Sequence, residues 1–429
     1  MHYYRRRLTI FLSSILSLCM ISQTSVFAAA GDIDSDNNIS KEDVNLFRSF
    51  LTGDESAADI DLTLADCNGD SKADVLDYIL LKDMVLKSAQ KQDQTYIHLE
   101  GKTITIDGNN AVADENKKIV TITASGSYSI DGTLEDGQIC VNIPDTEADP
   151  GTVKLFFNGV NITGVSEAPL YIANAENTSV NLARDTVNYL YDGPEYTQTE
   201  AVVYAKDDIT FKGEGTLEIH ADAHNAVHCS NDLKINGCRM NIETLTGDAL
   251  RGKNSVEIKS GEINIDSKSD SIKSTKGEVN ISGGTISVKS GADAVQAETS
   301  INISGGTLTA CGDRGLTGVK DINITGGTVL ATATDNQSGV FSSVTIPSML
   351  LEYSEECPKN NAVIIKNTDG NILYDQNTLK KFSYAFIASD SLGTDVEYIL
   401  FTGDLQTHQT DSDIFTAGLP ASYTGLINK

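Results

Sequence analysis

The fold of this chain is decided by four short segments: Val256-Glu-Ile258, Gly261-Glu-Ile263-Asn-Ile265, Val279-Asn-Ile281 and Gly284-Thr-Ile286-Ser-Val288. Apolar and polar residues alternate within each segment, which is typical of β-strands that turn one face inside. The second pair of segments repeats the first after 23 residues, and a glycine stands at the turn within each pair. Repetition at this length indicates a solenoid, in which each coil packs on the next.

Apolar pairs two residues apart carry the same pattern along much of the chain. The steps between first members are 27, 29, 24, 23, 23, 22 and 21 residues. The pairs are Val153/Leu155, Val180/Leu182, Ile209/Phe211, Leu233/Ile235, Val256/Ile258, Val279/Ile281, Ile301/Ile303 and Ile322/Ile324. This spacing predicts a mainly β protein with a parallel β-helix over residues 92–340, since the consensus of a leucine-rich repeat is absent. An antiparallel sandwich is the alternative, but it does not explain the period.

The ends of a stacked coil are open sheet edges that need covering. Residues 95–145 alternate like strands and are expected to cap one end. The period is lost beyond Val340, so residues 341–429 are expected to form a C-terminal β cap and tail. The longer early steps predict turn insertions, including one from Tyr191 to Thr199.

Residues 1–30 have the features of a secretory signal peptide. Arg5-Arg-Arg7 precedes a mostly apolar stretch, and Ala28-Ala-Ala30 supplies small residues for cleavage. An uncleaved membrane anchor is the alternative. We therefore expect a secreted, extracellular protein that is not inserted in a membrane after signal removal.

The composition limits the partners of the 429-residue chain. Its formal net charge of −28 would repel a phosphate backbone, so nucleic acid is not an expected partner. The absence of Trp argues against flat stacking on crystalline cellulose. The six cysteines after residue 30 are interpreted mainly as buried single thiols, with Cys229 and Cys238 the only close pair.

Two acidic loops, at residues 32–43 and 66–77, lie 34 residues apart. Each places oxygen donors where a calcium-binding loop needs them, and an apolar helical pattern follows each one, over residues 44–51 and 78–86. An acidic solvated linker would lack this repeat. The expected calcium ligands are Asp32, Asp34, Asp36, Asn38, Ser40, Asp43, Asp66, Asn68, Asp70, Lys72, Asp74 and Asp77, with Asn38 and Lys72 acting through the backbone carbonyl.

The tandem unit over residues 31–91 resembles a type I dockerin, the module that docks secreted enzymes and binding proteins onto a cohesin of a cellulosomal scaffoldin. The resemblance implies a small α-helical domain with calcium as cofactor and cohesin contacts at loop positions 10 and 11. Those positions hold Lys41, Glu42, Val75 and Leu76. Asn37 and Ser71 replace the glycine usual at position 6, and Ser71 predicts weaker calcium binding by the second loop.

A short polar segment recurs in the later coils at steps of 23, 22 and 23 residues. Its first residues are expected to stack as one column, formed by Asn225, Asp248, Asp270 and Asp293. Its fourth residues are expected to stack beside them as a second column, formed by His228, Arg251, Lys273 and Gln296. Tyr204 aligns with His228 and is a candidate stacking residue.

Stacked carboxylates about 5 Å apart repel by roughly 3 kcal/mol at an effective dielectric of 20. Calcium bridging would offset this repulsion, which predicts a metal site at Asp248, Asp270 and Asp293. Asn225 and the second column would then bind an anionic substrate such as pectic galacturonan. The alternative is that Asp simply favours the turns of a β-helix, where it accepts hydrogen bonds from backbone N–H groups.

A second resemblance rests on four segments: 128–138, Lys206-Asp-Asp-Ile209, Gly247-Asp-Ala-Leu-Arg-Gly-Lys253 and Ile281-Ser-Gly-Gly-Thr-Ile286. Over residues 95–405 the chain looks like a family of secreted clostridial carbohydrate-binding proteins, which are right-handed parallel β-helices resembling pectate lyases. The resemblance implies calcium-dependent binding of plant cell-wall polysaccharide, acidic pectin or cellulose, by a cellulosome-associated protein.

A calcium-dependent pectate lyase is the alternative function. Elimination needs a base to take a proton, and Lys273 is the candidate because Arg251 lies one coil away. Asp270, three residues before Lys273, opposes this role because it favours the protonated ammonium. We therefore expect binding rather than catalysis.

Overall fold

A computed structural model describes residues 30–36, 38–54, 60–92, 94–193, 200–335, 341–367, 369–393, 397–404, 410–416 and 424–427. Residues 1–29 of the predicted signal peptide, and Asn37, lie outside these residues. The chain divides into two compact units, Met1–Gln92 and Asp93–Lys429. No helix among the described residues is long and apolar enough to cross a membrane.

The first unit is helical, with α1 (Lys41–Leu51), α2 (Leu62–Ala65) and α3 (Val75–Gln92). The helices predicted after the two acidic loops are confirmed as α1 and α3. Ser40 caps α1: its hydroxyl accepts a hydrogen bond from an N–H of the first turn, while the Asp43 carboxylate accepts from the Ser40 N–H. Phe47 and Leu81 are fully buried between these elements and form the small core with Ile33 and Ala65.

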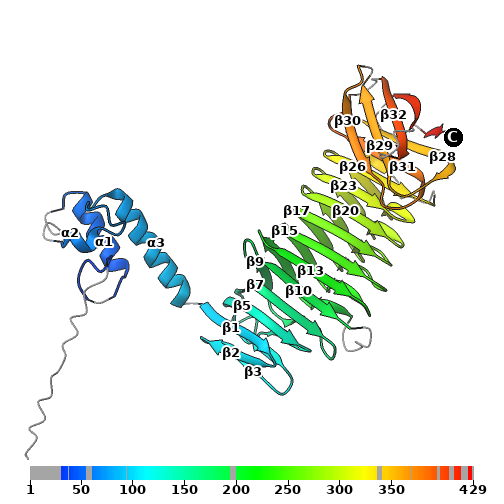
Figure 1. The fold of residues 1–429 in the computed structure, drawn as a ribbon. Coiled ribbons are helices and arrows are strands. Elements are labelled where there is room, and N and C mark those ends of the chain that lie inside the picture. Colours follow the sequence, from blue (N-terminus) through cyan, green and yellow to red (C-terminus); the bar gives the residue numbers. More distant parts are fainter. Residues whose placement is uncertain are drawn as a thin grey trace, which may run out of the picture. The chain divides into compact units, whose positions relative to one another are not determined.

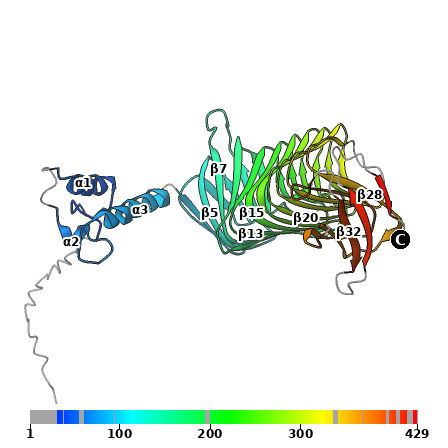
Figure 2. The same cartoon turned by 90° about the horizontal axis from the view of Figure 1, so that it is seen from above.

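The second unit is a parallel β-helix, as the period predicts, and Figures 1 and 2 show its strands stacked along one axis. Four long strands bend across two faces of the 20-stranded sheet: β5 (Gly126–Glu135), β7 (Thr152–Gly164), β15 (Asp232–Thr244) and β17 (Ser255–Ser267). The first long face also contains β9 (Asn177–Leu182), β12 (Asp208–Gly213), β19 (Glu278–Ile281), β22 (Ser300–Ile303), β25 (Asp321–Ile324) and β27 (Phe341–Val344). The second long face contains β10 (Val187–Asp192), β13 (Thr216–Ala221), β20 (Thr285–Ser290), β23 (Thr307–Cys311) and β26 (Thr328–Ala333).

A separate ten-stranded sheet closes each coil, and we call its outer surface the short face. Its strands are β3 (Ala111–Asp114), β4 (Ile119–Ile122), β6 (Gln138–Asn142), β8 (Leu170–Asn174), β11 (Ala201–Ala205), β14 (Asn225–Cys229), β16 (Leu250–Gly252), β18 (Ile272–Ser274), β21 (Asp293–Ala297) and β24 (Arg314–Gly318). Gly261 lets the chain turn between the two long faces, because it has a φ of +122° and a Cβ there would lie 2.4 Å from the Cys238 carbonyl oxygen.

The predicted apolar pairs point into the coil and are almost fully buried. Five successive steps, from Ile209/Phe211 to Ile322/Ile324, have the predicted register. One pair is placed wrongly: the partners of Ile209 and Phe211 are Thr178 and Val180, not Val180 and Leu182. A slip of two residues keeps the same side chains inside, so alternation alone does not detect it.

The N-terminal part of the coil differs from the predicted cap. β1 (Gln94–Gly101) already pairs in parallel with β5, and β4 pairs in parallel with β6, so much of residues 95–145 forms coils. Antiparallel pairing is confined there to β2 (Thr103–Asp107) against β1 and to β3 against β4. The predicted insertion also starts later than expected, because Tyr191 belongs to β10; residues 194–199 lie outside the described residues.

The C-terminal strands follow the last coils. Parallel pairing continues through β27, beyond residue 340, and β31 (Phe382–Ser389) then runs antiparallel along β26. β28 (Ser348–Cys357) pairs with β31 and with β34 (Thr424–Ile427). A four-stranded antiparallel sheet has the order β30 (Ile372–Asn377), β29 (Asn361–Asn367), β32 (Glu397–Asp404) and β33 (Thr410–Thr416).

The six described cysteines are free thiols. Cys229, Cys238, Cys311 and Cys357 are buried, and Cys67 and Cys140 are half-buried. Burial raises the pKa of the Cys229 and Cys238 thiols to about 12, so both remain protonated at neutral pH.

Candidate functional site

The first acidic loop gathers three carboxylates before helix α1. Oxygen atoms of Asp32, Asp34 and Asp36 all lie within 4.8 Å of one another. Partial desolvation raises the pKa of Asp34, and the charges of Asp43, Asp36 and Asp32 raise it further. A divalent cation would relieve this crowding, so the hard oxygen donors present here fit calcium.

The second loop brings Asp66, Asp70 and Asp77 to the same mutual distance of 4.8 Å or less. Asp77 is buried and accepts hydrogen bonds from the N–H groups of Asn68 and Asp74, both at 3.0 Å. Desolvation acts to raise the pKa of Asp77, but the backbone hydrogen bonds outweigh it and lower that pKa. This acid therefore stays ionised and available to a cation.

The remaining predicted ligands hold the loops in shape. The N–H groups of Asn38 and Lys72, predicted to bind through their carbonyls, donate to Asp36 at 2.7 Å and to Asp70 at 2.9 Å. At the helix starts, the Ser40 and Asp74 side chains each accept from a backbone N–H two residues on. Thus the structure brings three acids of each loop together and places Ser40 and Asp74 at helix N-termini.

Ser71 adopts the left-handed conformation that position 6 of the loop needs, with a φ of +67°. Its N–H donates to Asp66 Oδ2 at 2.8 Å, which ties this residue to the acidic cluster. A non-glycine residue with this φ is strained, which is consistent with weaker calcium binding by the second loop. The weaker binding itself stays a prediction.

The residues expected to contact a cohesin lie at the exposed starts of α1 and α3. Lys41 and Glu42 are exposed on α1, whereas Val75 and Leu76 are 59% and 56% exposed on α3. Sequence reasoning missed that α3 continues this apolar surface for another turn, with Ile79 and Leu80 also exposed. The second half therefore presents an apolar surface and the first half a charged one.

In the β-helix, the acids of the first column follow one another along the short face as the spacing predicts. The Asp248 N–H donates to Asn225 Oδ1 at 2.8 Å, the Asp270 N–H to Asp248 Oδ1 at 3.1 Å, and the Asp293 N–H to Asp270 Oδ1 at 2.9 Å. The three aspartates are 1–6% exposed. Asn225, Asp248 and Asp270 thus each satisfy a backbone N–H of the next coil, which is the structural role that sequence analysis left open.

The second column lies beside the first and is outward-facing and half-buried. His228 is in register with Arg251, Arg251 with Lys273, and Lys273 with Gln296. Burial lowers the pKa of His228, and the charge of Arg251 lowers it further, so His228 is neutral at neutral pH. The fixed charges of this column are therefore those of Arg251 and Lys273.

The two columns are joined by ion pairs. Arg251 Nη1 lies 3.3 Å from Asp248 Oδ2. Lys273 Nζ lies 2.6 Å from Asp270 Oδ2 and 3.8 Å from Asp248 Oδ2, so this ammonium takes the bridging position expected for an ion. Among the described residues, the metal-like acid clusters are those of the two loops. Calcium binding by Asp248, Asp270 and Asp293 stays a prediction.

Sequence reasoning missed two groups that extend the columns. Tyr171 is in register with Tyr204, and the two rings stack with centroids 5.6 Å apart at 7°. Lys206 Nζ lies 5.5 Å from the centroid of the Tyr171 ring, and Tyr204 in turn contacts His228 at 5.2 Å between centroids. A Tyr at residue 171, within the polar–apolar alternation of 170–174, is the only signal the sequence offers.

The second missed residue is Arg314, which is in register with Asp293. Its Nε and Nη2 lie 2.5 and 2.9 Å from the two carboxylate oxygens of Asp293. Burial raises the pKa of Asp293 and the Asp270 charge raises it further, while Arg314 opposes both effects. Arg314 therefore neutralises the last acid of the column, as Lys273 and Arg251 neutralise the others.

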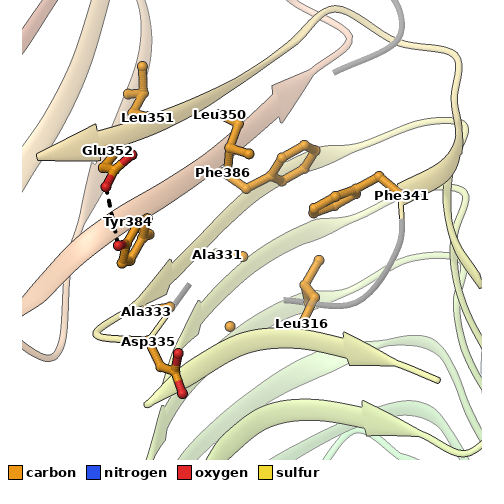
Figure 3. A pocket seen from close by; sticks show the side chains of 11 residues that line it. Leu316, Ala331, Ala333, Asp335, Phe341, Leu350, Leu351, Glu352, Tyr384 and Phe386 are labelled. Atoms are coloured by element: carbon orange, nitrogen blue, oxygen red, sulfur yellow. Dashed lines mark hydrogen bonds between the residues drawn. The ribbon is translucent and has the colours of Figure 1, made fainter. Parts of the chain in front are cut away.

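A separate cavity of about 220 Å³ lies where the last coils meet the C-terminal strands (Figure 3). Phe341 and Phe386 stack there with ring centroids 4.3 Å apart, and the Tyr384 hydroxyl donates to Glu352 at 3.3 Å. The cavity is mostly apolar and smaller than the roughly 300–1,000 Å³ of usual ligand pockets. It does not suit a polysaccharide.

Comparison with known proteins finds a matching family in each unit of the chain. Residues 115–346 match the family described as carbohydrate-binding domain-containing protein, and residues 30–86 match the type I dockerin domain. Type I dockerins are calcium-binding modules of extracellular cellulosome components, and cohesins are their partners.

A carbohydrate-binding domain-containing protein of Acetivibrio thermocellus is 38% identical over 136 residues, which cover 30% of this chain and 46% of that protein. The chain thus spans less than half the length of this relative. A solved structure, a gadolinium derivative of the polysaccharide lyase-like protein from C. thermocellum, is 29% identical with a TM-score of 0.48, covering 59% of this chain and 97% of the other. The carbohydrate-binding family matches residues 115–346, which are more than half of this chain. The chain therefore belongs to the family of carbohydrate-binding domain-containing proteins, and it also carries a type I dockerin domain.

Proposed function

We propose that this protein is a secreted component of a cellulosome that binds acidic plant cell-wall polysaccharide of the pectin type, with calcium, and docks onto a cohesin. The β-helix holds the polysaccharide along its short face. The observation that carries the proposal is the continuous outward ladder of aromatic rings and cations at Tyr171, Tyr204, His228, Arg251 and Lys273.

The ladder matches the chemistry of a galacturonan chain. Sugar rings offer apolar C–H faces to aromatic side chains, and each galacturonate adds a carboxylate that pairs with Arg or Lys. Successive side chains stand about 4.8 Å apart, as strands do, which is close to the advance of one sugar in an extended chain. Arg251 uses one nitrogen on Asp248, and its guanidinium has other N–H donors for a ligand.

Two buried polar atoms also support this face. Arg251 Nε and Gln296 Oε1 have no hydrogen-bond partner within the part of the chain that the structure describes. Buried polar groups in proteins are normally paired with protein, water or ligand. A hydroxyl-rich ligand, or water ordered by it, would supply the missing partners.

Calcium enters the proposal in two places. In the dockerin, the carboxylate clusters of the two loops hold the ions. At the short face, the acidic chain draws Arg251 and Lys273 onto its own carboxylates, and calcium takes the place of the Lys273 ammonium between Asp270 and Asp248. Calcium and the Lys273 ammonium are both cations, so the carboxylates of Asp270 and Asp248 have a positive charge beside them before and after the exchange.

The exposed apolar surface at the start of α3 is the proposed main contact with the cohesin. Depletion of charge and exposure of apolar side chains are features of interface cores. A pull-down against a panel of type I cohesins tests it with Leu76→Lys, compared with Val112→Lys at a 63% exposed apolar position of the β-helix. Loss of capture by Leu76→Lys alone supports the contact, and equal capture by both variants opposes it.

Affinity electrophoresis tests the polysaccharide proposal. The full chain is run in gels containing polygalacturonate, with calcium and with a chelator. We expect retardation in calcium that is reduced by the chelator and by Tyr204→Ala. If the wild-type chain migrates equally with and without polygalacturonate, the proposed ligand is wrong.

The ion pairs favour binding over elimination. A lyase base needs a free lone pair, but Lys273 Nζ donates to Asp270 Oδ2 at 2.6 Å. The same protein samples, incubated with polygalacturonate and calcium, are expected to give no growth in the ultraviolet absorbance of unsaturated product. Growth of that signal, lost in Lys273→Ala, would establish the lyase instead.

A further inference from the structure

A second concave surface lies on the second long face of the β-helix, away from the strands that carry the two columns. It is a groove of about 510 Å³. Side chains of β10, β13, β15, β17 and β20 line it. Figure 1 shows these strands stacked along the axis of the β-helix, so the groove runs across several coils. Its length along the axis therefore suits an extended chain rather than a compact ligand.

The groove is built from two parallel rows of side chains, one residue from each coil. Parallel register fixes both rows. The first row consists of Tyr189, Glu218, Asn241, Asn264 and Ser287. The second row consists of Tyr191, His220, Glu243, Asp266 and Lys289.

The aromatic end of the groove offers a flat apolar surface. The Tyr189 and Tyr191 rings are stacked, with centroids 5.9 Å apart and planes at 23°. The His220 ring meets the edge of Tyr191 at 6.3 Å and 66°. Such a surface suits the C–H face of a sugar ring.

The rest of the first row offers hydrogen-bonding groups held in place by one another. The Asn241 amide donates to Glu218 Oε1 at 2.7 Å, and the Asn264 amide donates to Asn241 Oδ1 at 3.0 Å. Each of these side chains keeps further lone pairs or N–H groups, because an amide has two donors and two acceptor sites. Fixed amides and carboxylates are the groups that orient sugar hydroxyls.

The charges of the groove distinguish it from the short face. Lys289 is neutralised by Asp266 at 2.6 Å. His220 lies between Asp222 at 2.9 Å and Glu243 at 3.2 Å, so these nitrogens add no unopposed positive charge. Glu218 and Glu243 leave the groove acidic, and it would repel a polygalacturonate chain.

The far end of the groove is closed by the C-terminal region. Leu379 is one of the lining residues. Lys380 holds its segment against the coil, since its Nζ donates to the Ser290 carbonyl at 2.6 Å and to Asp313 at 2.9 Å. A wall at one end and aromatic rings at the other define the length of chain that the groove accepts.

We propose that this groove is a second glycan site that takes a single neutral polysaccharide chain. It recognises the chain by stacking on Tyr189 and Tyr191 and by hydrogen bonds to the amide row. It works independently of the short face, so the proposal stands whether or not that face binds pectin.

Isothermal titration of the full chain with cellohexaose, xylohexaose and hexagalacturonate, all in calcium, tests the proposal. We expect at least one neutral probe to bind, and Tyr191→Ala to weaken it roughly tenfold because a stacking contact is lost. The matched control is Tyr204→Ala on the short face, which is expected to leave the neutral probe within about twofold of wild type. For hexagalacturonate we expect the reverse: Tyr204→Ala weakens its binding, and Tyr191→Ala leaves it close to wild type.

A second variant guards against misfolding of Tyr191→Ala. Ser287→Trp adds bulk at a half-buried position of the first row without removing an aromatic contact, and it should abolish binding of the neutral probe while the melting temperature stays at the wild-type value. The proposal is overturned if neither neutral hexasaccharide binds, if both groove variants bind it as wild type does, or if Tyr204→Ala weakens it as much as Tyr191→Ala.

Discussion

The aspartates of the dockerin loops and those of the β-helix column are alike in sequence but differ in what their oxygens contact. In the loops, three carboxylates from one short stretch converge within 4.8 Å. In the column, Asp248, Asp270 and Asp293 come from successive coils, and each accepts a backbone hydrogen bond or pairs with Arg251, Lys273 or Arg314. A repeat of acids therefore indicates a metal where the carboxylates converge on one another, and not where each one already has an Arg or Lys side chain beside it.

In our proposal, calcium in the loops stabilises the dockerin fold, whereas calcium at the column binds together with the polysaccharide. The loops need an ion to hold their own acids together. The column is already neutral in the absence of ligand, because the bridging position is taken by Lys273 Nζ. The following predictions test that separation.

The largest effect is expected from a chelator on the full chain. An ion present at a thousand times its Kd stabilises its domain by about 4 kcal/mol. Removing calcium should therefore abolish the melting transition of the dockerin, or lower it by more than roughly 10 °C, because small domains respond steeply. The β-helix transition should stay in place. Differential scanning calorimetry measures both, and a β-helix transition that falls as far would show ions in the ligand-free column.

Asp270→Ala is expected to destabilise the β-helix by about 2–4 kcal/mol, because it removes the nearer carboxylate from the Lys273 ammonium and the acceptor from the Asp293 N–H. Denaturant unfolding followed by circular dichroism measures the loss. The matched control is Asp266→Ala, which removes a half-exposed ion pair with Lys289 and should cost less than about 1 kcal/mol. Equal losses would mean that the column contributes no more than a surface pair.

Lys273→Met should convert the column into a calcium site without ligand. The change removes the bridging charge and leaves Asp270 and Asp248 facing each other across its place. We expect the variant to lose roughly 1–3 kcal/mol of stability in chelator and to regain part of it in calcium. Melting curves in both buffers measure this. If the melting temperature of the variant is the same in calcium and in chelator, the proposal that the column binds calcium is wrong.

The smallest effect concerns pH. The pKa of His228 is lowered in the folded state, so protonation favours the unfolded chain as pH falls below about 6.5. His228→Gln removes this penalty. Between pH 7.5 and 5.5 the melting temperature of the variant should therefore rise relative to wild type by roughly 1 °C. A relative fall would show that protonated His228 is stabilised by Glu200 instead.

Much of the fold follows from the sequence because burial and period are local signals. Inward residues such as Ile258 and Ile281 repeat with an almost constant step. The predicted position of the pair Val180/Leu182 is wrong by two residues, because a slip of two keeps the same face inside. The pairing of Ile209 with Thr178 in the structure gives the true register. Tyr191 was assigned to a turn because the long step around it hides the end of β10.

The sites are less readable than the fold. The Asp column could be predicted because its steps are 22 or 23 residues, but the partners of its oxygens depend on the neighbouring coil. Tyr171 is not predicted because it lies 33 residues before Tyr204, a longer step than the repeat. Arg314 is not predicted because it stands in line with the aspartates of the first column but carries the opposite charge. The groove combines residues of different types from five strands, so no sequence motif predicts it.

The most direct measurement is titration of the full chain with hexagalacturonate in calcium, comparing Arg251→Gln with Arg239→Gln. Both arginines make one carboxylate ion pair, at 3.3 and 2.9 Å, but Arg251 lies on the short face and Arg239 on the second long face. The account predicts that Arg251→Gln weakens binding by about tenfold or more, as loss of a charge-assisted contact should, and that Arg239→Gln changes it less than about twofold. Equal affinity of the two variants, or no binding by the wild-type chain, would contradict it.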